Sequence, residues 1–330
     1  MISNKINRGL KGEPNIPGDK SISHRSIIIP SISNGKTIVK NLLKSQDVLH
    51  TINAFKLMGV KINFNDEIVE IFGNGLRSLS IPKNEIYLGN SGTSARLLIG
   101  LLASQKFESI VTGDKSLSSR PMKRITDPLK KMKAKIQTTD GKLPINIYGK
   151  DLSGCNLDIK IPSAQIKSGL LLAALSAEGT TEITEHHTTR DHTEIMLEAF
   201  GADIEINNDK SKKIIKIKGG KELSSKDISV PCDLSSSAFF IVAALINKES
   251  KLLLKDININ PTRNGILIAL EKMGANISYL NKRTNNKEII CDILVSSSSL
   301  KGCELDENIA KLMIDEYPIL SVAASFANSP

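Results

Sequence analysis

The chain has 330 residues, of which 40% are hydrophobic and 24% are charged, and this composition suits a folded protein of two ordinary domains. No apolar run approaches the roughly 20 residues that cross a bilayer, and the polar start has no secretory signal, so we expect no membrane partner and a cytoplasmic location. The net charge of +9 would suit nucleic acid, but aromatic residues make up only 4% and the lysines are dispersed, so we expect no nucleic-acid partner and favour anionic small molecules.

A segment with a polar start and an apolar body, typical of a helix, recurs five times at a spacing of roughly 70 to 80 residues, which indicates a repeat architecture. The five copies begin near Ser21, Ser91, Ser163, Ser235 and Asp315. A second helix follows four of them and ends at Met58-Gly59-Val60, Met132-Lys133-Ala134, Gly201-Ala202 and Met273-Gly274-Ala275. No second helix follows the fifth copy, so the last repeat is predicted to lack its partner elements.

Strands are predicted after both kinds of helix. Short strands follow the first helices at residues 37–39, 109–111, 181–184 and 252–254, and β-hairpins follow the second helices around residues 62–71, 136–147, 204–217 and 277–295. Each repeat therefore reads helix, strand, helix and two strands, an α/β chain of α+β repeats that differs from a single wound βαβ sheet. Since one repeat cannot bury its own apolar faces, the repeats must pack together.

The third repeat gives the clearest boundaries. Its first helix is predicted over residues 163–177, from the spacing of Ile166 and Leu170, with Gly179 beyond its end. Its second helix is predicted over residues 191–200. The first helices are apolar almost all round at residues 97–102, 170–175 and 239–245, so we expect them to be buried.

Polar residues gather where these helices begin, and the richest start is the segment from Pro17 to Arg25. Ser21 suits an N-cap, and Arg25 lies four residues further along the same helix face. Lys20, Ser21 and Arg25 can then converge on one anion beside the positive end of the helix. The alternative is a capped helix that carries a solvated lysine and a solvated arginine.

Other helix starts carry the same kinds of group. Gly92, within Gly89-Asn90-Ser91-Gly92-Thr93, allows backbone amides to come close to a ligand. Arg120 precedes Pro121 at the start of a second helix, where alone it would be a surface charge. Ser163-Ala164-Gln165 opens a buried helix with groups that form hydrogen bonds.

Two further starts hold titratable groups. Arg190-Asp191-His192 opens a second helix, and a structural or capping role is the alternative for His192, since no metal-ligand spacing surrounds it. Asp315-Glu316 opens the first helix of the fifth repeat, where the alternative is a simple favourable contact of the acid with the helix dipole. If the helix starts face one cleft, that cleft binds anions and contains one candidate base.

The four cysteines predict neither a disulfide framework nor a metal site. They form no Cys-x-x-Cys pair and have no neighbouring histidine, at Cys155, Cys232, Cys291 and Cys303. Thiols of this kind are usual in a reducing compartment, so free cysteines and no bound metal are expected.

Together these segments resemble the EPSP synthase family, the 3-phosphoshikimate 1-carboxyvinyltransferases. The resemblance covers essentially the whole chain and rests on six ordered motifs, at residues 17–25, 89–96, 119–122, 163–165, 189–192 and 314–318. Ala164 and the pair Arg190-Asp191 are similar to the branch of the family that departs from the enteric type.

The resemblance implies transfer of the enolpyruvyl group of phosphoenolpyruvate to the 5-hydroxyl of shikimate 3-phosphate, on the route to chorismate and the aromatic amino acids. It also implies a monomer that needs no cofactor and is a target of glyphosate. The family has two hinged domains of three repeats each. Residues 19–232 would form the complete domain, on the shikimate 3-phosphate side, and residues 1–18 with 233–330 would form a partial, discontinuous domain.

Residue roles are implied by the matching positions. The residues implied to bind shikimate 3-phosphate are Lys20, Ser21, Arg25, Ser163, Ala164, Gln165, Arg190 and Asp315. Those implied to bind phosphoenolpyruvate are Lys20, Asn90, Gly92, Arg120 and Gln165. Catalysis is implied for Asp315, which would accept the proton of the attacking hydroxyl, and for Lys20, which would touch both substrates and assist proton transfer.

The C-terminal end departs from the family. The family continues with a Lys-Glu-Ser/Thr-Asp-Arg type motif, which carries a catalytic acid and two cations, and this motif does not occur in the 330 residues. We therefore expect a C-terminally incomplete family fold, with the second half of one domain missing, that is inactive by itself. One alternative is a shikimate 3-phosphate binding fragment without turnover. Another is the sister transferase that acts on UDP-N-acetylglucosamine, but that family lacks the Lys-Ser-x-Ser-His-Arg start.

Overall fold

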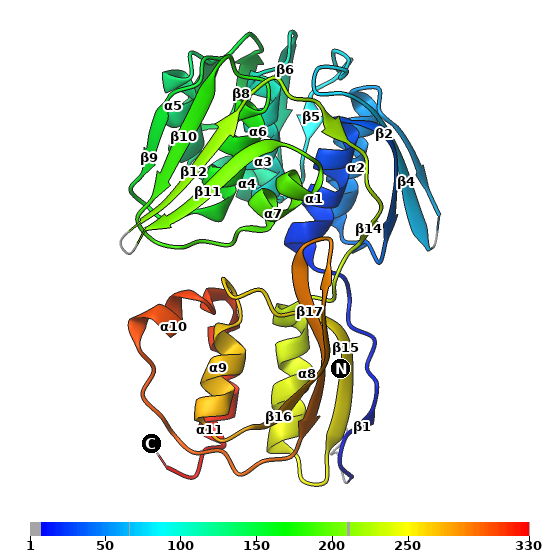
Figure 1. Ribbon diagram of the computed structural model, residues 1–330, viewed down its shortest axis with the longest axis vertical. Helices are drawn as coiled ribbons and strands as arrows, with labels where there is room; N and C mark the ends of the chain where they lie inside the picture. The colour runs from blue at the N-terminus through cyan, green and yellow to red at the C-terminus, as the bar shows by residue number, and fades with distance from the viewer. Residues whose placement is uncertain (1–7, 66, 210–211, 330) are drawn as a thin grey trace. The chain divides into compact units, whose positions relative to one another are not determined.

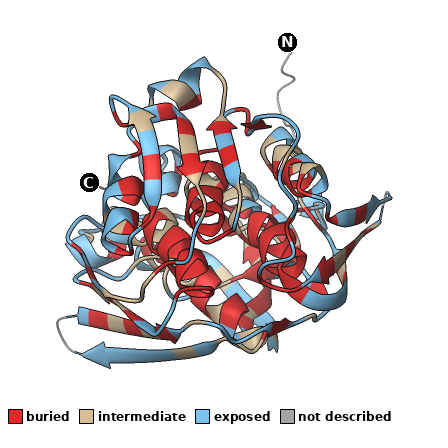
Figure 2. Ribbon diagram, turned by 90° about the horizontal axis from the view of Figure 1, so that it is seen from above, coloured by how far each residue is buried: buried red, intermediate tan, exposed pale blue. Residues whose placement is uncertain are grey.

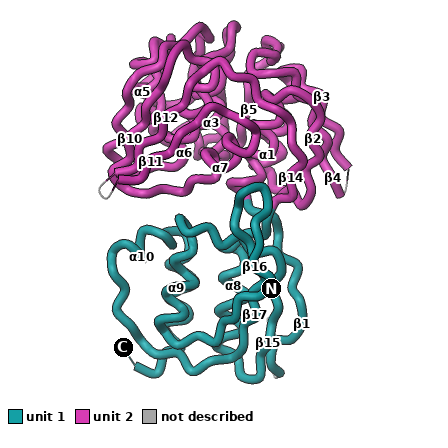
Figure 3. The backbone as a smooth tube through the Cα atoms, in the orientation of Figure 1, with its two compact units in different colours: residues 1–19, 231–330 teal, residues 20–230 magenta. Residues whose placement is uncertain are grey.

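The computed structural model describes residues 8–65, 67–209 and 212–329, and the chain divides into two compact units (Figure 1). Unit 1 comprises residues 1–19 and 231–330, and unit 2 comprises residues 20–230 (Figure 3). Each unit has its own hydrophobic core. No helix among the described residues is long and apolar enough to span a bilayer.

Unit 2 contains three repeats with one order of elements, so the predicted mixed α/β repeat pattern is confirmed. The first repeat holds α1 (Lys20–Ser31), β2 (Ser33–Lys40), α2 (Gln46–Leu57), β3 (Lys61–Phe64) and β4 (Ile68–Asn74). The second holds β5 (Ile86–Tyr87), α3 (Gly92–Ala103), β6 (Glu108–Thr112), α4 (Lys115–Ser119), α5 (Lys123–Lys131), β7 (Lys135–Thr139) and β8 (Lys142–Tyr148). The third holds β9 (Asn156–Ile159), α6 (Ala164–Ala174), β10 (Thr180–Glu185), α7 (His192–Ala199), β11 (Asp203–Asp209) and β12 (Lys212–Lys218).

The three sheets of unit 2 are built alike. In the third repeat the antiparallel hairpin β11–β12 joins β10, and β9 completes the edge in parallel, with Leu157 opposite Ile183. β5 has the same place beside β6 in the second repeat. In the first repeat the parallel edge beside β2 comes from β13 (Leu223–Ser224) and β14 (Ile228–Ser229), which follow the third repeat in sequence. The chain therefore links its third repeat back to its first.

These parallel edge strands are absent from the sequence predictions. They contain two to four residues each, which is too few for a period-2 pattern to show. The short helix α4 is absent for the same reason, since its five residues do not complete two helical turns. Arg120 consequently closes α4 and lies ahead of α5, so its predicted place at the start of a second helix is wrong.

The first helices of the repeats form the core of unit 2. α3 and α6 are buried along most of their length, as predicted, and Figure 2 shows such buried helices bordered by strands that alternate buried and exposed residues. A Cβ placed on Gly100 of α3 would lie 1.9 Å from the carbonyl oxygen of Gly169 in α6. Since no real Cβ comes that close to another atom, the crossing of α3 and α6 requires glycine at residue 100.

Unit 1 holds one complete repeat and part of another. Its elements are β1 (Lys11–Gly12), α8 (Leu234–Ile246), β15 (Lys251–Asn258), α9 (Gly265–Lys272), β16 (Asn276–Asn285), β17 (Glu288–Ser296), α10 (Glu307–Lys311), the 3-10 helix η1 (Ile314–Glu316) and α11 (Tyr317–Ser325). One sheet runs in the order β1-β15-β17-β16, and β1 is again a parallel edge strand.

Three predicted helix features need correction. α1 begins at Lys20, so Ser21 lies within its first turn and is not the N-cap. α6 becomes a turn after Ala174 and does not continue to residue 177. The first helix of the fifth repeat starts as the 3-10 turn η1 and becomes α-helical only at Tyr317. Pro318 then lies in the first turn of α11, where proline is well accommodated.

The prediction that residues 239–245 are buried all round is wrong for α8. Phe239 is 59% exposed and Phe240 is 38% exposed. The core of unit 1 reaches only one face of α8, the face with Ala238, Ile241 and Val242. A helix can therefore be apolar all round in sequence and still bury a single stripe.

Candidate active site

Arg25 lies inside unit 2, where its guanidinium joins three helices. Nε donates to Thr193 Oγ1 over 2.6 Å, Nη2 donates to Ser168 Oγ over 2.8 Å, and Nη1 donates to Ser21 O over 2.7 Å. These partners belong to α7, α6 and α1. The side chain is buried, so the alternative of a solvated Arg25 is wrong.

Lys20, at the start of α1, is closer to solvent. Its Nζ lies 2.8 Å from Asp47 Oδ2 of α2, and just over half of its side-chain surface is exposed. An exposed ion pair of this kind contributes little to stability. Lys20 can therefore exchange Asp47 for a ligand without disturbing the fold.

A buried cluster of polar side chains joins α1, α2 and α3. His24 Nδ1 lies 2.9 Å from Thr51 Oγ1 and 3.2 Å from Ser94 Oγ, and these two hydroxyl oxygens are 2.6 Å apart. Ser91 caps α3, because its Oγ accepts from the backbone N–H of Ser94 over 3.2 Å. The starts of α1 and α3, which carry two of the predicted motifs, are thereby fixed to each other within unit 2.

Predicted ligands of phosphoenolpyruvate meet at the starts of α3 and α6. Arg120 Nη2 donates to Asn90 Oδ1 over 2.5 Å. Gln165 Nε2 donates to Thr93 Oγ1 over 3.0 Å, and Gln165 Oε1 accepts from Arg96 Nη1 over 2.6 Å. The contacts bring Asn90, Arg120 and Gln165 together and add Arg96, which has no role in the sequence predictions.

Gly92 lies between two guanidinium groups. A Cβ placed on Gly92 would lie 2.9 Å from Nη1 of Arg120 and 2.9 Å from Nη1 of Arg96. Arg96 Nη1 also donates to Gly92 O over 3.3 Å. The missing side chain thus allows two arginines to approach the N-terminus of α3, where the positive end of the helix dipole also favours an anion. The position of Arg96, one helical turn after Gly92, is the sequence signal that could have identified it.

Arg96, Arg120 and Arg124 form what we call the arginine corner. Burial, and then the charges of Arg120 and Arg124, hold the pKa of the Arg96 guanidinium below its ordinary value. Arg124 Nη2 lies 3.4 Å from the carbonyl oxygens of both Ile161 and Pro162, just ahead of α6. A multiply charged anion would offset the repulsion among the three guanidinium groups.

The remaining candidates of unit 2 lie at the starts of α6 and α7. Ser163 caps α6 by accepting from the backbone N–H of Ile166 over 3.4 Å, and Ala164 is the first helical residue. Arg190 lies in the loop between β10 and α7, two residues ahead of that helix. His192 is buried at the first position of α7, which is consistent with its structural alternative.

Asp315 belongs to unit 1, where it occupies an exposed position of η1. Its neighbour Glu316 is buried and accepts a hydrogen bond from Ser235 Oγ of α8. Ser235 Oγ in turn accepts from Arg263 Nη2 over 2.8 Å. The short segment that carries Asp315 is therefore anchored to the core of unit 1 through Glu316.

Arg263, which is absent from the sequence predictions, is the centre of a buried ion cluster in unit 1. Its guanidinium contacts the Asp19 carboxylate and lies 3.0 Å from Asp233 Oδ1. Burial and the charge of Asp19 raise the pKa of Asp233 above its usual range. Burial opposes the charge of Arg263, but Asp19 and Asp233 outweigh it and hold the pKa of Arg263 above its ordinary value.

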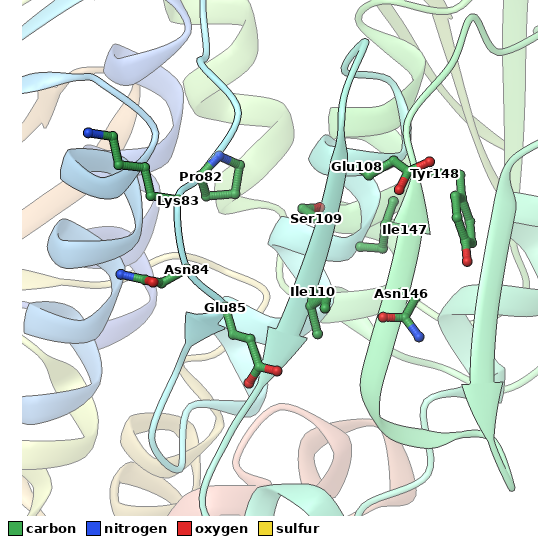
Figure 4. Close-up of a pocket in the computed structure, with 10 residues that line it drawn as sticks. All are labelled: Pro82, Lys83, Asn84, Glu85, Glu108, Ser109, Ile110, Asn146, Ile147 and Tyr148. Carbon is green, nitrogen blue, oxygen red and sulfur yellow. The ribbon is translucent and has the colours of Figure 1, made fainter.

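A separate pocket lies against the second sheet of unit 2 (Figure 4). It is lined by Pro82, Lys83, Asn84, Glu85, Glu108, Ser109, Ile110, Asn146, Ile147 and Tyr148, and none of these is a candidate residue. Within the described parts of the chain, no group of three or more His, Cys, Asp or Glu side chains could hold a metal ion. The cysteines are free thiols.

Comparison with known proteins identifies the family. The sequence model of EPSP synthase (3-phosphoshikimate 1-carboxyvinyltransferase) matches residues 5–330. The 3-phosphoshikimate 1-carboxyvinyltransferase of Geobacter metallireducens is 47% identical over 322 residues, which cover 97% of this chain and 74% of that protein. The enzyme of that name from Ruthia magnifica is 48% identical over 324 residues, which cover 98% of this chain and 74% of that protein.

Solved structures agree with the sequence relatives. An EPSP synthase structure from Acinetobacter baumannii superposes on this chain with a TM-score of 0.91 at 46% identity. The matched region covers 97% of this chain and 72% of the Acinetobacter baumannii chain. The chain thus spans about three quarters of the length of these relatives. Since the family match extends over nearly every residue and the identity is close to one half, the chain belongs to the EPSP synthase (3-phosphoshikimate 1-carboxyvinyltransferase) family.

Proposed function

We propose that this chain binds shikimate 3-phosphate and phosphoenolpyruvate on unit 2 and contributes Asp315 of unit 1 to enolpyruvyl transfer. The 5-hydroxyl of shikimate 3-phosphate adds to phosphoenolpyruvate, phosphate leaves, and 5-enolpyruvylshikimate 3-phosphate forms. The arginine corner around Gly92 carries this proposal, because like charges beside a helix N-terminus favour a multiply charged small anion. The names of the relatives favour these substrates over UDP-N-acetylglucosamine.

Phosphoenolpyruvate occupies the arginine corner in this proposal. Its phosphate and carboxylate match two guanidinium groups and the positive end of the α3 helix dipole. Arg120 and Gln165 are already held in place there by Asn90, Thr93 and Arg96. Lys20 adds an ammonium that reaches both substrates.

Shikimate 3-phosphate binds beside it, on the starts of α1, α6 and α7. Its proposed ligands there are Ser21, Arg25, Ser163, Ala164, Gln165 and Arg190. Arg25 is suited to this task because three helices fix its guanidinium before any ligand arrives.

The addition step needs two proton transfers, because a base must take the proton of the attacking hydroxyl and an acid must protonate the methylene carbon of phosphoenolpyruvate. In the elimination step the bond to phosphate breaks and a base removes a proton from the resulting methyl group, which restores the C=C bond of the product. Asp315 is the proposed base, and Lys20 assists the proton transfers because its ammonium contacts both substrates. This division gives the domain proposed over residues 19–232, which corresponds to unit 2, the binding task, and it gives unit 1 the base.

The relatives are longer than this chain, and that difference bears on turnover. We infer that the acid and the additional cations of the complete site lie in sequence outside residues 1–330, in the missing half of the domain formed by residues 1–18 and 233–330. On this proposal residues 1–330 bind shikimate 3-phosphate but do not turn it over. A cytoplasmic monomer without a cofactor is also proposed.

Calorimetric titration of residues 1–330 with shikimate 3-phosphate tests the binding proposal. We expect saturable binding, and Arg25→Ala should weaken it by about 1.5 to 3 kcal/mol, the scale of a hydrogen bond to a charged group. Arg283→Ala is the matched control, because Arg283 belongs to unit 1 and its side chain is 40% exposed. Absence of binding by the folded, unmutated chain would refute the proposal.

Gly92→Ala should separate phosphoenolpyruvate from the longer inhibitor glyphosate. In a chain extended to the length of its relatives, the new methyl group displaces Arg96 and Arg120, and the inhibition constant of glyphosate should rise about tenfold or more. The Michaelis constant for phosphoenolpyruvate should rise less. Arg283→Ala is again the control, because Arg283 belongs to unit 1 and its side chain is 40% exposed. Equal inhibition of the Gly92→Ala and unmutated enzymes would contradict this placement.

A further inference from the structure

We propose that Lys167 is a positioning residue for the shikimate 3-phosphate site. Its buried ammonium contacts the loop that carries Arg190, and it fixes the position of α6 relative to α7, the two helices whose hydroxyl groups bind Arg25. The inference rests on the proposed function, in which both arginines bind shikimate 3-phosphate. Lys167 lies in α6 and its side chain is fully buried. A buried charge that takes no direct part in the chemistry needs another reason for its presence.

The ammonium is the centre of a four-membered ion cluster in unit 2. Lys167 Nζ lies 2.7 Å from Glu185 Oε2 and 2.7 Å from Glu194 Oε1. Lys213 Nζ lies 3.2 Å from the same Glu194 oxygen. Two cations thus face two carboxylates, and the cluster ties α6 to β10, α7 and β12.

Charge in this cluster is maintained against burial. Burial disfavours the charged ammonium of Lys167, but Glu194 and Glu185 outweigh it and raise the pKa of Lys167 above its ordinary value. Burial likewise opposes the Glu194 carboxylate, and Lys167 and Lys213 lower its pKa. The charges of Lys167 and Glu194 therefore stabilise each other, and loss of the Lys167 cation would leave a carboxylate buried without compensation.

The first connection runs to Arg190. Lys167 Nζ donates to Thr189 O over 3.5 Å, and Thr189 Oγ1 donates to Glu185 Oε1 over 2.6 Å. Thr189 is the residue directly before Arg190. The ion cluster thereby holds both the backbone and the side chain at the end of the loop that presents Arg190.

The second connection runs to Arg25. Ser168 and Thr193, the two hydroxyl residues that bind Arg25, are the sequence neighbours of Lys167 and Glu194. Their oxygens are also 2.6 Å apart from each other. The ion pair between Lys167 and Glu194 therefore fixes how α6 lies against α7, and with it the two acceptors of Arg25.

Shikimate 3-phosphate titrations of residues 1–330 test the inference without any need for turnover. Lys167→Met should raise the Kd about tenfold or more, the factor expected when a ligand loses one hydrogen bond to a charged group. Glu185→Gln, which leaves a milder imbalance, should raise the Kd about threefold. Lys216→Met is the matched control, because Lys216 pairs with Glu182 on the same sheet but is 43% exposed, and its Kd should stay unchanged.

Double variants that combine Lys167→Met with an arginine variant distinguish a positioning role of Lys167 from a general effect on stability. The effect of Lys167→Met should shrink when Arg25→Ala or Arg190→Ala is already present, because residues that act through one another are not additive. If Lys167→Met does not fold, Glu185→Gln decides in its place. An unchanged Kd in the folded variant, or full additivity with both arginine variants, overturns the inference. Failure of the unmutated chain to bind would instead refute the proposed function.

Discussion

A polypeptide of residues 1–330 is expected to convert phosphoenolpyruvate and shikimate 3-phosphate at a rate near background. Asp315 is the proposed base, and on the same proposal the partner acid and the additional cations lie outside these residues. General acid–base catalysis typically contributes about 10²–10⁴-fold, and electrostatic stabilisation of developing charge contributes a comparable or larger factor. The turnover number should therefore be at least about 10⁴-fold below that of a complete relative.

Phosphate release measures this turnover directly, and the enzyme of Geobacter metallireducens is a suitable reference at 47% identity. Both proteins should be assayed with saturating substrates, and residues 1–330 should first be shown to bind shikimate 3-phosphate. A turnover number within tenfold of the reference would show that the remaining quarter of the relatives' length is dispensable.

Arg263→Met should destabilise unit 1 strongly. The variant leaves the carboxylates of Asp19 and Asp233 buried without their cation, and it removes the donor that holds Ser235 against Glu316. Breaking a buried ion cluster by removing one partner costs about 3–5 kcal/mol of unfolding free energy. Because Glu316 adjoins Asp315, the segment with the proposed base should also lose protection.

Denaturant unfolding with a probe in unit 1 checks this result. Arg283→Met is the control, because Arg283 pairs with Asp256 and Asp292 while its own side chain is 40% exposed. An exposed pair contributes about 1 kcal/mol or less. Equal losses in the two variants would show that the buried cluster of Arg263 has no special weight.

The repeat pattern can be predicted from the sequence because each helix and hairpin has its own regular spacing of apolar residues. The hairpin around residues 204–217 alternates Ile with polar residues, and α6 shows helical spacing from Ile166 to Leu170. Edge strands such as β5 and β13 carry no such signal, since each has two residues. Their formation depends on a neighbouring strand that only the folded chain supplies.

The candidate site divides in the same way. Helix starts are readable from sequence, so Ser163 and Gln165 could be identified as neighbours of a buried helix. The partners that hold the site are distant in sequence, as with Arg25 and Thr193, which are 168 residues apart. Arg263 and Asp19 are 244 residues apart. No local pattern distinguishes these buried charges from ordinary surface lysines and arginines.

Hydrogen exchange of residues 1–330, with and without shikimate 3-phosphate, tests the central claim most directly, because it reports where the ligand lies. We expect slower exchange at the first turns of α1 and α6 and in the loop from His186 to Asp191, with little change at the pocket lined by Glu108 and Tyr148. Protection at that pocket, or unchanged exchange at all three predicted segments under saturating ligand, would contradict the placement of the site on unit 2.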